Sequence, residues 1–174
     1  RYSFDFDFFT KEEFDEKIII QRLKELFPDF KLEREDWRTV LAYIGDIRFS
    51  LFFYKYPLLT KTHKFLNVEI TDIKDIAPMK IAAIADRGVK RDFIDLYFIF
   101  EVRKILTLDV ALTLYDKKFK ALTQNKFHIL KSLAYFEDAE EGVLPQMIEK
   151  LNWIKVKQFF IKEQKRLTKK LLGI

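Results

Sequence analysis

The sequence contains no cysteine, and glycine and proline occur only four times each in 174 residues. The absence of cysteine excludes disulfide bonds and thiolate metal sites, and it fits a protein of the reducing cytoplasm. The low glycine and proline content argues against a flexible linker or a disordered tail. No apolar run is long enough to span a membrane, and no secretory leader is visible. We therefore expect a cytoplasmic protein without a membrane segment.

Apolar and aromatic residues are abundant instead. Apolar residues make up 49% of the chain, and phenylalanine alone occurs 19 times. This composition predicts an ordered globular protein, either a single domain or a small two-part enzyme. The net charge of +5 is concentrated near the end, because residues 155–172 hold seven basic residues and one acid. This segment is equally compatible with a solvated surface and with a nucleic-acid contact.

The chain opens with an alternating pattern. Residues 2–8 carry an aromatic side chain at every second position, with Ser3, Asp5 and Asp7 between them. This two-residue period predicts a half-buried strand with an aromatic face and a polar face. Both aspartates are then expected to point to the same side.

Capping and turn signals predict the elements that follow. Residues 10–13 form a capping box that opens a helix ending near Leu26, with Phe14, Ile18 and Leu26 on its buried side. Beyond this helix, two β-rich runs joined at a Gly-Asp turn predict a hairpin, and a shorter strand is expected further on. The hairpin is predicted at residues 37–44 and 47–56, and the shorter strand at residues 65–70.

From residue 75 onward the hydrophobic period becomes that of helices. Asp75 is expected to cap the first helix, with Pro78 in its first turn and Gly88 closing it. The sequence thus predicts an α+β protein, with a mixed-sheet lobe over residues 1–72 and a helical lobe over residues 73–174. Further helices are predicted at residues 91–104, 108–122, 125–137 and 155–172.

The aspartates of the first strand form a candidate metal site. Carboxylates two residues apart on a strand lie roughly 7 Å apart at their Cα atoms, so Asp5 and Asp7 are close enough to share one or two hard cations. Phosphoryl transfer uses Mg²⁺ or Mn²⁺ ions held in this way to neutralise a triphosphate. The alternative interpretation is a solvated strand face.

A second candidate group lies on the predicted helices. Lys80 and Arg87 are seven residues apart, so they project from one helix face and are able to contact triphosphate oxygens. Asp92 and Asp95, three residues apart at the start of the next helix, are able to orient cations or accept a proton. The alternatives are a solvated Lys80, a local Arg91–Asp95 ion pair and a favourable charge of Asp92 at a helix N-terminus.

Two segments resemble the AbiEii/AbiGii nucleotidyltransferase toxin family. Residues 1–10 resemble its strand motif, approximately Arg-x-Ser-x-Asp-x-Asp followed by two hydrophobic residues and Thr. Residues 75–97 resemble its downstream motifs, in which a Lys is followed by an Arg and then by a basic-Asp-x-x-Asp-Leu-Tyr segment. The two matches occur in the family's order, and the resemblance extends to about residue 104.

The resemblance implies a nucleotidyltransferase-like lobe, here N-terminally incomplete, and a set of residue roles. It implies Asp5 and Asp7 as metal ligands, Ser3, Lys80, Arg87 and Asp92 as nucleotide-binding residues, and Asp5, Asp7, Lys80 and Asp95 as catalytic residues.

Two departures from the family pattern concern catalysis. The family has a phosphate-gripping Gly-Gly-Ser/Thr turn ahead of its acidic strand, and that turn would lie before Arg1. Enzymes of this fold also commonly carry a third carboxylate on a later strand. The corresponding face here presents Arg48, Ser50, Phe52 and Tyr54. Asp46 or the helix carboxylates are the possible substitutes.

The expected function is transfer of a nucleoside monophosphate from an NTP to a hydroxyl acceptor. The resemblance implies that the acceptor is RNA, particularly a tRNA 3′ end, that the protein is a growth-arresting toxin, and that a cognate antitoxin is its partner. The basic face of residues 155–170 is the expected RNA contact. Two alternatives stay open, namely an inactive homologue with a binding or regulatory role and a nucleotidyltransferase that acts on a small molecule.

Overall fold

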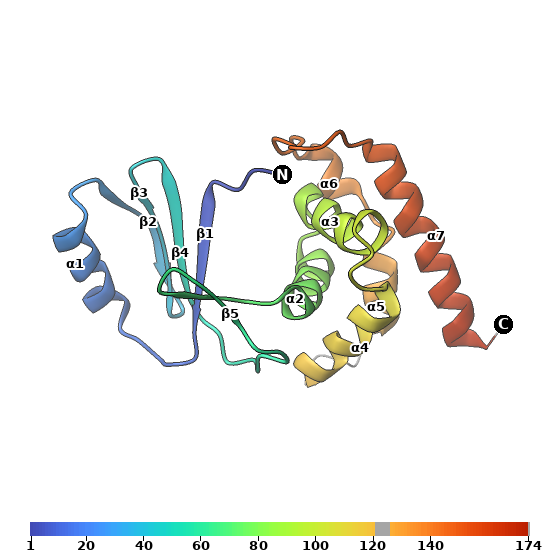
Figure 1. Cartoon of the computed structure of the whole chain (residues 1–174), viewed down its shortest axis with the longest axis horizontal. Coiled ribbons are helices and arrows are strands. Elements are labelled where there is room, and N and C mark those ends of the chain that lie inside the picture. The colour runs from blue at the N-terminus through green and yellow to red at the C-terminus, as the bar shows by residue number, and fades with distance from the viewer. Residues whose placement is uncertain (121–125, 174) are drawn as a thin grey trace. The chain divides into compact units, whose positions relative to one another are not determined.

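The computed structural model describes residues 1–120 and 126–173, which form two compact units. Unit 1 comprises Arg1–Tyr56 and unit 2 comprises Pro57–Ile174. Figure 1 shows that the strands of the four-stranded sheet belong to the first unit and most helices to the second. The protein is therefore of the α+β class, as predicted. The division falls at Tyr56–Pro57, earlier than the predicted residue 72, because the segment after Pro57 is hydrogen-bonded to helices of unit 2.

Unit 1 is a mixed four-stranded sheet with the strand order β1-β4-β3-β2 and one helix. β1 runs parallel to β4, whereas β3 pairs antiparallel with both β4 and β2. The predicted hairpin is confirmed, since Ile44 pairs with Ile47 across a turn in which Gly45 has a φ of +58°. The elements are β1 (Asp5–Thr10), α1 (Glu16–Leu26), β2 (Phe30–Asp36), β3 (Thr39–Ile44) and β4 (Ile47–Phe53).

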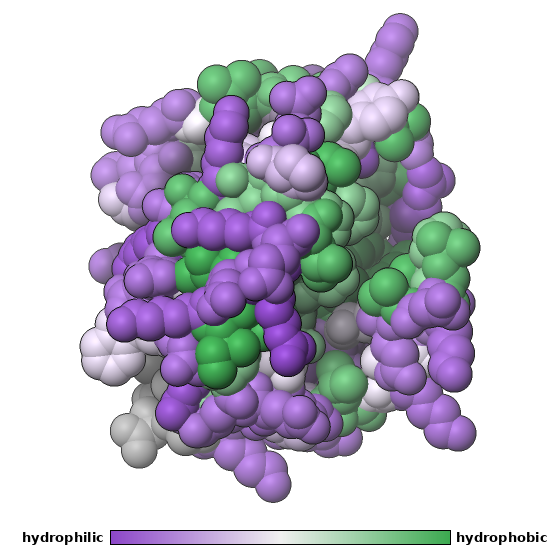
Figure 2. Space-filling view, turned by 90° about the vertical axis from the view of Figure 1, so that its left-hand side faces the viewer, coloured by the Kyte–Doolittle hydropathy of each residue, from purple (hydrophilic) through white to green (hydrophobic). Residues whose placement is uncertain are grey.

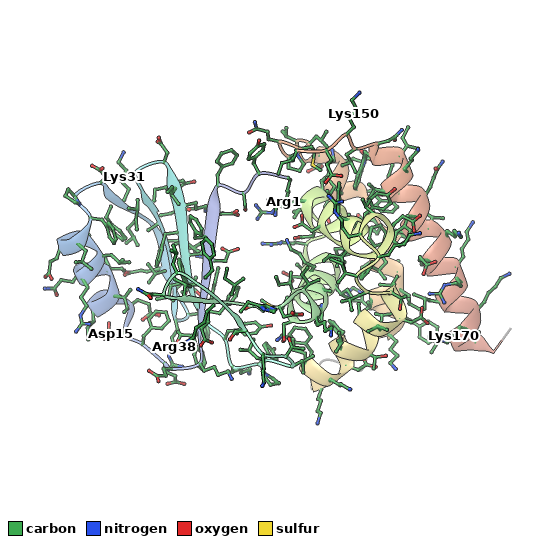
Figure 3. The ribbon with its side chains drawn as sticks, in the orientation of Figure 1. Arg1, Asp15, Lys31, Arg38, Lys150 and Lys170 are labelled. Atoms are coloured by element: carbon green, nitrogen blue, oxygen red, sulfur yellow. The ribbon has the colours of Figure 1, made fainter. Side chains whose placement is uncertain are left out.

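Strand β2 was not predicted from the sequence. Its residues, Phe-Lys-Leu-Glu-Arg-Glu-Asp, have no clear apolar face, and β2 is an edge strand that is mostly exposed. The β2–β3 turn also lacks glycine, although Trp37 and Arg38 both have positive φ angles of 48° and 55°. Arg38 is held by a salt bridge of 2.7 Å to Glu13 and lies over the Phe53 ring. Figure 3 shows Arg38 and Asp15 at the same end of this unit.

Helix α1 begins later than the capping box predicted. Its N-cap is Asp15, whose side chain accepts a hydrogen bond from the Lys17 N–H at 2.8 Å. The predicted burial of Ile18 and Leu26 is wrong. Both are exposed, and Ile20 is buried in their place. Figure 2 views the protein from the side of unit 1 and shows hydrophobic residues between hydrophilic ones on this surface.

The predicted first strand is confirmed as β1, but its aromatic side chains are less buried than expected. Phe4 is 65% exposed and Phe6 is 59% exposed. β1 is an edge strand of the sheet, so its aromatic side chains have strand neighbours on one side only. Phe8 is better covered because it packs against Phe49, with ring centroids 5.4 Å apart.

Unit 2 begins with a two-stranded hairpin and continues as a helical bundle. Residues 121–125 lie outside the described residues, and so do the ends of two predicted helices, Leu122 and Asn125. The elements are β5 (His63–Phe65), β6 (Val68–Ile70), α2 (Ile73–Asp86), α3 (Lys90–Tyr97), the π-helical turn η1 (Phe98–Val102), α4 (Leu108–Lys118), α5 (Lys126–Ser132), α6 (Glu137–Glu141) and α7 (Trp153–Leu172).

The core of unit 2 is assembled from α2, α3 and α7. Phe93 is fully buried and contacts the rings of Phe136, Trp153 and Phe160. The predicted buried stripe of α7 is confirmed at Val156, Phe160 and Leu167, whereas Leu171 is 43% exposed in the last turn. None of the described helices is long and apolar enough to cross a membrane.

Of the two predictions for the ends of α2, one is confirmed and the other is wrong. The prediction that Gly88 closes the helix is confirmed, because its φ is +52° and its N–H donates to the Ala83 carbonyl oxygen at 3.2 Å. The prediction that Asp75 caps the helix is wrong. The N-cap is Asp72, which accepts from the Lys74 N–H at 2.8 Å, and Asp75 lies buried inside the first turn.

Candidate functional site

The acidic pair lies on β1 in unit 1. Asp5 and Asp7 are two positions apart on one strand, so their side chains leave the same face of the sheet. Their partners in the parallel register with β4 are Arg48 and Ser50. Ser3, the other polar residue of the predicted motif, donates a hydrogen bond from its hydroxyl to Asp5. The structure thus brings the three polar residues of the first motif to one edge of the sheet.

The neighbouring strand supplies no further acid to this face. Arg48 donates two hydrogen bonds, at 2.9 and 3.0 Å, to Glu33. Glu33 lies on β2, where the register with β3 is irregular. These bonds raise the pKa of the Arg48 guanidinium, burial lowers it, and the Asp5 carboxylate adds a smaller increase. Asp46, the suggested substitute, lies in the turn just ahead of β4. Throughout the described residues no three acidic or histidine side chains gather as a ligand set for a metal.

Lys80 is the centre of the second group, which lies within unit 2. It extends from α2 to α3, where its Nζ lies 2.7 Å from Asp92 Oδ1 and 2.8 Å from Asp95 Oδ2. Asp92 is fully buried, whereas the Asp95 side chain is 21% exposed and that of Lys80 is 22% exposed. The three predicted residues therefore form one compact ion-pair cluster with an accessible side.

Arg87 approaches the same cluster from the end of α2. It is the C-cap residue of the helix, and its Nε lies 3.7 Å from Asp92 Oδ2. That oxygen accepts no hydrogen bond within the described part of the chain. Lys80 and Arg87 thus reach one carboxylate from two sides, in keeping with their seven-residue spacing. Asp92 is buried and does not contact a ligand itself. Its charge holds Lys80 and attracts Arg87.

The cluster has the chemistry of a phosphate-binding group. An ammonium has three N–H donors, and Lys80 uses two of them on Asp92 and Asp95. One donor is left for an oxygen of a ligand, and the half-exposed Arg87 offers a second cationic contact. Asp95, which is partly exposed beside Lys80, is the carboxylate that a substrate is able to reach.

Sequence analysis missed a buried ion pair close to this cluster. The Nζ of Lys118 on α4 lies 2.7 Å from Asp75 Oδ1, and both side chains are fully buried. Burial raises the pKa of the Asp75 carboxyl, but hydrogen bonds from Lys118, Thr60 and Leu59 outweigh it and leave the pKa below its ordinary value. No local pattern reveals Lys118, because its partner lies on a different helix.

The two histidines, to which the sequence assigned no role, make local contacts. The Nε2 atom of His63 lies 2.7 Å from Asp72 Oδ2, and this contact is the largest cause of the lowered pKa of Asp72. The Nε2 atom of His128 lies 3.1 Å from the backbone oxygen of Ala85. Both rings are therefore engaged at the two ends of α2.

The basic helix α7 separates into paired and unpaired cations. Lys157 pairs with Glu140, and Arg166 and Lys170 both pair with Asp109 of α4. Figure 3 shows Lys170 near the end of α7. On α7, the exposed lysines that have no ion pair within the described residues are Lys155, Lys162, Lys165 and Lys169. Three of them are seven residues apart, so they lie nearly in line along one side of the helix.

The sequence is 38% identical to aq_aa25, an uncharacterized protein of Aquifex aeolicus (strain VF5), over 174 residues covering 95% of this chain and 79% of that protein. The chain belongs to the same family as aq_aa25. No profile of a known protein family matches it.

Two Helicobacter pylori crystal structures were also matched. JHP933 is 18% identical with a TM-score of 0.49, covering 99% of this chain and 82% of JHP933. A protein described provisionally as a nucleotidyltransferase is 18% identical with a TM-score of 0.45, covering 96% and 81% of the two chains.

Proposed function

We propose that this protein is a nucleotidyltransferase that moves a nucleoside monophosphate from an NTP to a hydroxyl acceptor. The observation that carries this proposal is the cluster of Lys80, Asp92 and Asp95, in which a buried carboxylate and a partly exposed one hold a single ammonium. The spacing of these residues is also what resembles the AbiEii/AbiGii toxins. A solvated surface lysine would not need two carboxylates from a neighbouring helix.

The residues have separate roles in the proposed reaction. The acceptor oxygen attacks the α-phosphorus of the NTP, the bond to the β-phosphate breaks, and pyrophosphate leaves. Lys80 and Arg87 bind the phosphate oxygens and balance their negative charge. Asp95 takes the proton of the attacking hydroxyl, because it is the carboxylate of the cluster with solvent access. Asp92 holds Lys80 in place.

Asp5 and Asp7 fit a Mg²⁺ or Mn²⁺ ion as its protein ligands. Such ions bind one or two carboxylates and complete their coordination with water and substrate phosphates, so a third protein acid is not essential. Asp7 is exposed and Asp5 half-buried on an open edge strand, which leaves room for a nucleotide. A bound cation there would lower the charge repulsion between the triphosphate and the attacking oxygen.

The test of the proposed reaction is transfer of label from NTP to an RNA pool in the presence of Mn²⁺. We expect wild-type protein to label RNA and Asp5→Ala to abolish labelling. Lys80→Ala/Asp92→Asn should also abolish it, and this double variant leaves no buried unpaired charge. Asp29→Ala and Lys150→Ala are the matched controls, because both residues are exposed and lie outside the motifs.

The outcomes separate the competing functions. Unchanged labelling in both the Asp5 and the Lys80 variants would reject the site. Absence of transfer to RNA and to small hydroxyl compounds, with each common NTP, would favour an inactive homologue that acts as a binding or regulatory protein. Transfer to small molecules alone would favour an enzyme that modifies an antibiotic or a sugar phosphate.

RNA, particularly a tRNA 3′ end, is the proposed acceptor, and the unpaired lysines of α7 are its proposed contact. Lys162→Gln/Lys169→Gln should weaken RNA binding and flatten its salt dependence. Each lysine–phosphate contact that is lost lowers the number of counterions that RNA releases on binding. Lys157→Gln/Lys170→Gln removes the same charge from residues already paired with acids, and it should change RNA binding less. Equal effects of the two double variants would reject α7 as a specific contact.

Growth arrest and a cognate antitoxin complete the proposal. A protein that modifies tRNA ends would stop translation, so expression of the wild-type chain should arrest growth and Asp5→Ala should not. Under this proposal a neighbouring gene encodes a protein that restores growth when it is expressed together with the toxin. Growth that is unaffected by an active enzyme would reject the toxin role without affecting the proposed reaction.

A further inference from the structure

Asp75 accepts hydrogen bonds from three directions although it is fully buried. One carboxylate oxygen accepts from the Lys118 ammonium at 2.7 Å and from the Leu59 N–H at 2.9 Å. The other accepts from the N–H and the hydroxyl of Thr60, at 2.9 and 2.6 Å. Lys118 also donates to the Pro57 carbonyl oxygen at 2.8 Å. This network joins α2, α4 and the segment that follows Pro57.

Helix α2 is therefore held by ion pairs on two different sides. Asp75 connects it to α4, and Lys80 connects it to Asp92 and Asp95 of α3. Five residues along an α-helix correspond to a rotation of about 140° around its axis. A rotation of α2 that would loosen one connection would also disturb the other, so the two together fix the orientation of the helix.

We propose that Asp75 and Lys118 are positioning residues for Lys80. The inference rests on the proposed transferase function, because it assigns them a part in that reaction. Both side chains are fully buried, so neither touches the substrate. They fix the rotation of α2, and this keeps the third N–H of Lys80 directed away from its two carboxylates.

Stability alone gives little reason for this arrangement. Apolar side chains of similar volume often serve a protein core as well as a buried ion pair does, because desolvating two charges offsets much of their attraction. What an ion pair with additional hydrogen bonds provides is direction, since each partner must keep its geometry. Misplacing a reactive group by about 1 Å lowers a rate by about a hundredfold. A residue that orients Lys80 therefore has a large effect on the rate.

The experiment uses the full chain with Asp75→Asn/Lys118→Met, which removes both buried charges together. Asp116→Asn/Lys126→Met is the control, because it breaks an ion pair that joins α4 to α5, does not involve α2 and lies outside the proposed RNA contact. Thermal denaturation establishes that each variant is folded. The side-chain ammonium signal of Lys80 is followed by NMR, and kcat and KM for NTP are measured separately.

We expect the Asp75/Lys118 variant to change the Lys80 signal and to lower kcat about tenfold to a hundredfold with little change in KM. The control should leave the Lys80 signal and kcat unchanged. A folded Asp75/Lys118 variant with the wild-type Lys80 signal and kcat would overturn the inference.

Two further outcomes keep the test decisive. If the double variant does not fold, Thr60→Val removes one hydrogen bond to Asp75 and leaves the ion pair intact. It should shift the Lys80 signal in a milder way, and an unchanged signal would overturn the inference. If wild-type protein transfers no nucleotide, the proposed function fails, and a Lys80 signal that still responds supports positioning by Asp75 and Lys118.

Discussion

The two groups of charged residues are built in opposite ways. In unit 1 the acidic pair lies on an edge strand, where Asp7 is exposed and its carboxylate neither forms an ion pair nor accepts a hydrogen bond within the described residues. In unit 2 the charges of α2 and α3 neutralise one another, and one of them, Asp92, is fully buried. Asp7 is therefore exposed to solvent, whereas the cluster of unit 2 is part of the core.

Under the proposed function, activity and stability are therefore separable in unit 1 and coupled in unit 2. An exposed carboxylate on an edge strand contributes little to folding, because water solvates it equally well in the unfolded chain. A buried carboxylate requires its cation, because the interior solvates a lone charge poorly. Substitutions at the two sites should accordingly produce different patterns of lost stability and lost activity.

The largest effect on stability is expected from Lys80→Met. It leaves the fully buried Asp92 with only Arg87 at 3.7 Å, and removing one partner of a buried pair costs about 3–5 kcal/mol of unfolding free energy. Urea denaturation at neutral pH measures this cost. Lys80→Met/Asp92→Asn should recover most of the stability, and a single variant within about 0.5 kcal/mol of wild type would contradict the coupling.

A smaller effect is expected from Gly88→Ala, with Gly45→Ala as its counterpart in unit 1. Both glycines have positive φ angles, 52° and 58°, so alanine should cost about 1–2 kcal/mol at either position. An added Cβ at position 88 would lie at ordinary contact distance, 3.5 Å, from the Ile84 carbonyl oxygen. Thermal denaturation should thus show similar losses. A much larger loss at position 88 would show that packing, and not φ, decides there.

A still smaller loss of stability is expected when the pH is lowered. The hydrogen bond from Arg166, followed by that from Lys170, holds the pKa of Asp109 at about 2 against the opposing effect of burial, below its ordinary value of 3.8. This pair stabilises the protein above about pH 4, and the contribution is lost as the pH falls towards 2. Because Arg166 is 42% exposed, we expect only about 1 kcal/mol. Asp109→Asn should therefore have a flatter profile between pH 4 and pH 2 in urea denaturation.

The smallest effect on stability is expected at the acidic pair itself. Asp7→Asn should leave the unfolding free energy within about 0.5 kcal/mol of wild type, since the residue is exposed. The same change should abolish Mn²⁺-dependent transfer in the labelling assay. If Asp7→Asn destabilises the fold as much as Lys80→Met, the contrast between the two units disappears.

The helices of unit 2 were predictable where the signal is local. The apolar spacing of α7 placed Val156, Phe160 and Leu167 in the core, and Gly88 marked the end of α2. Both signals depend on residues within a few positions of one another. Lys80, Arg87, Asp92 and Asp95 were singled out from two consecutive predicted helices, but the ion pairs of Lys80 with Asp92 and Asp95 were not predicted.

The predictions failed where a choice between local signals depended on distant residues. Thr10 was predicted as the cap of α1, and Asp75 as the cap of α2. In each case the structure uses a cap that the sequence analysis did not choose. β2 was missed because its apolar content is low and its turn has no glycine; it is identified by its pairing with β3.

The sequence by itself determined the α+β composition, the position of the hairpin at Gly45 and the face that α7 buries, because helix period, strand period and glycine conformation are properties of neighbouring residues. Tertiary structure alone decided that Asp75 is an internal ion-pair partner of Lys118 and that Arg48 pairs with Glu33. The physical reason is that a charged side chain can be solvated by water or by any opposite charge that folding brings near it. Local sequence does not specify which partner, distant along the chain, will be there.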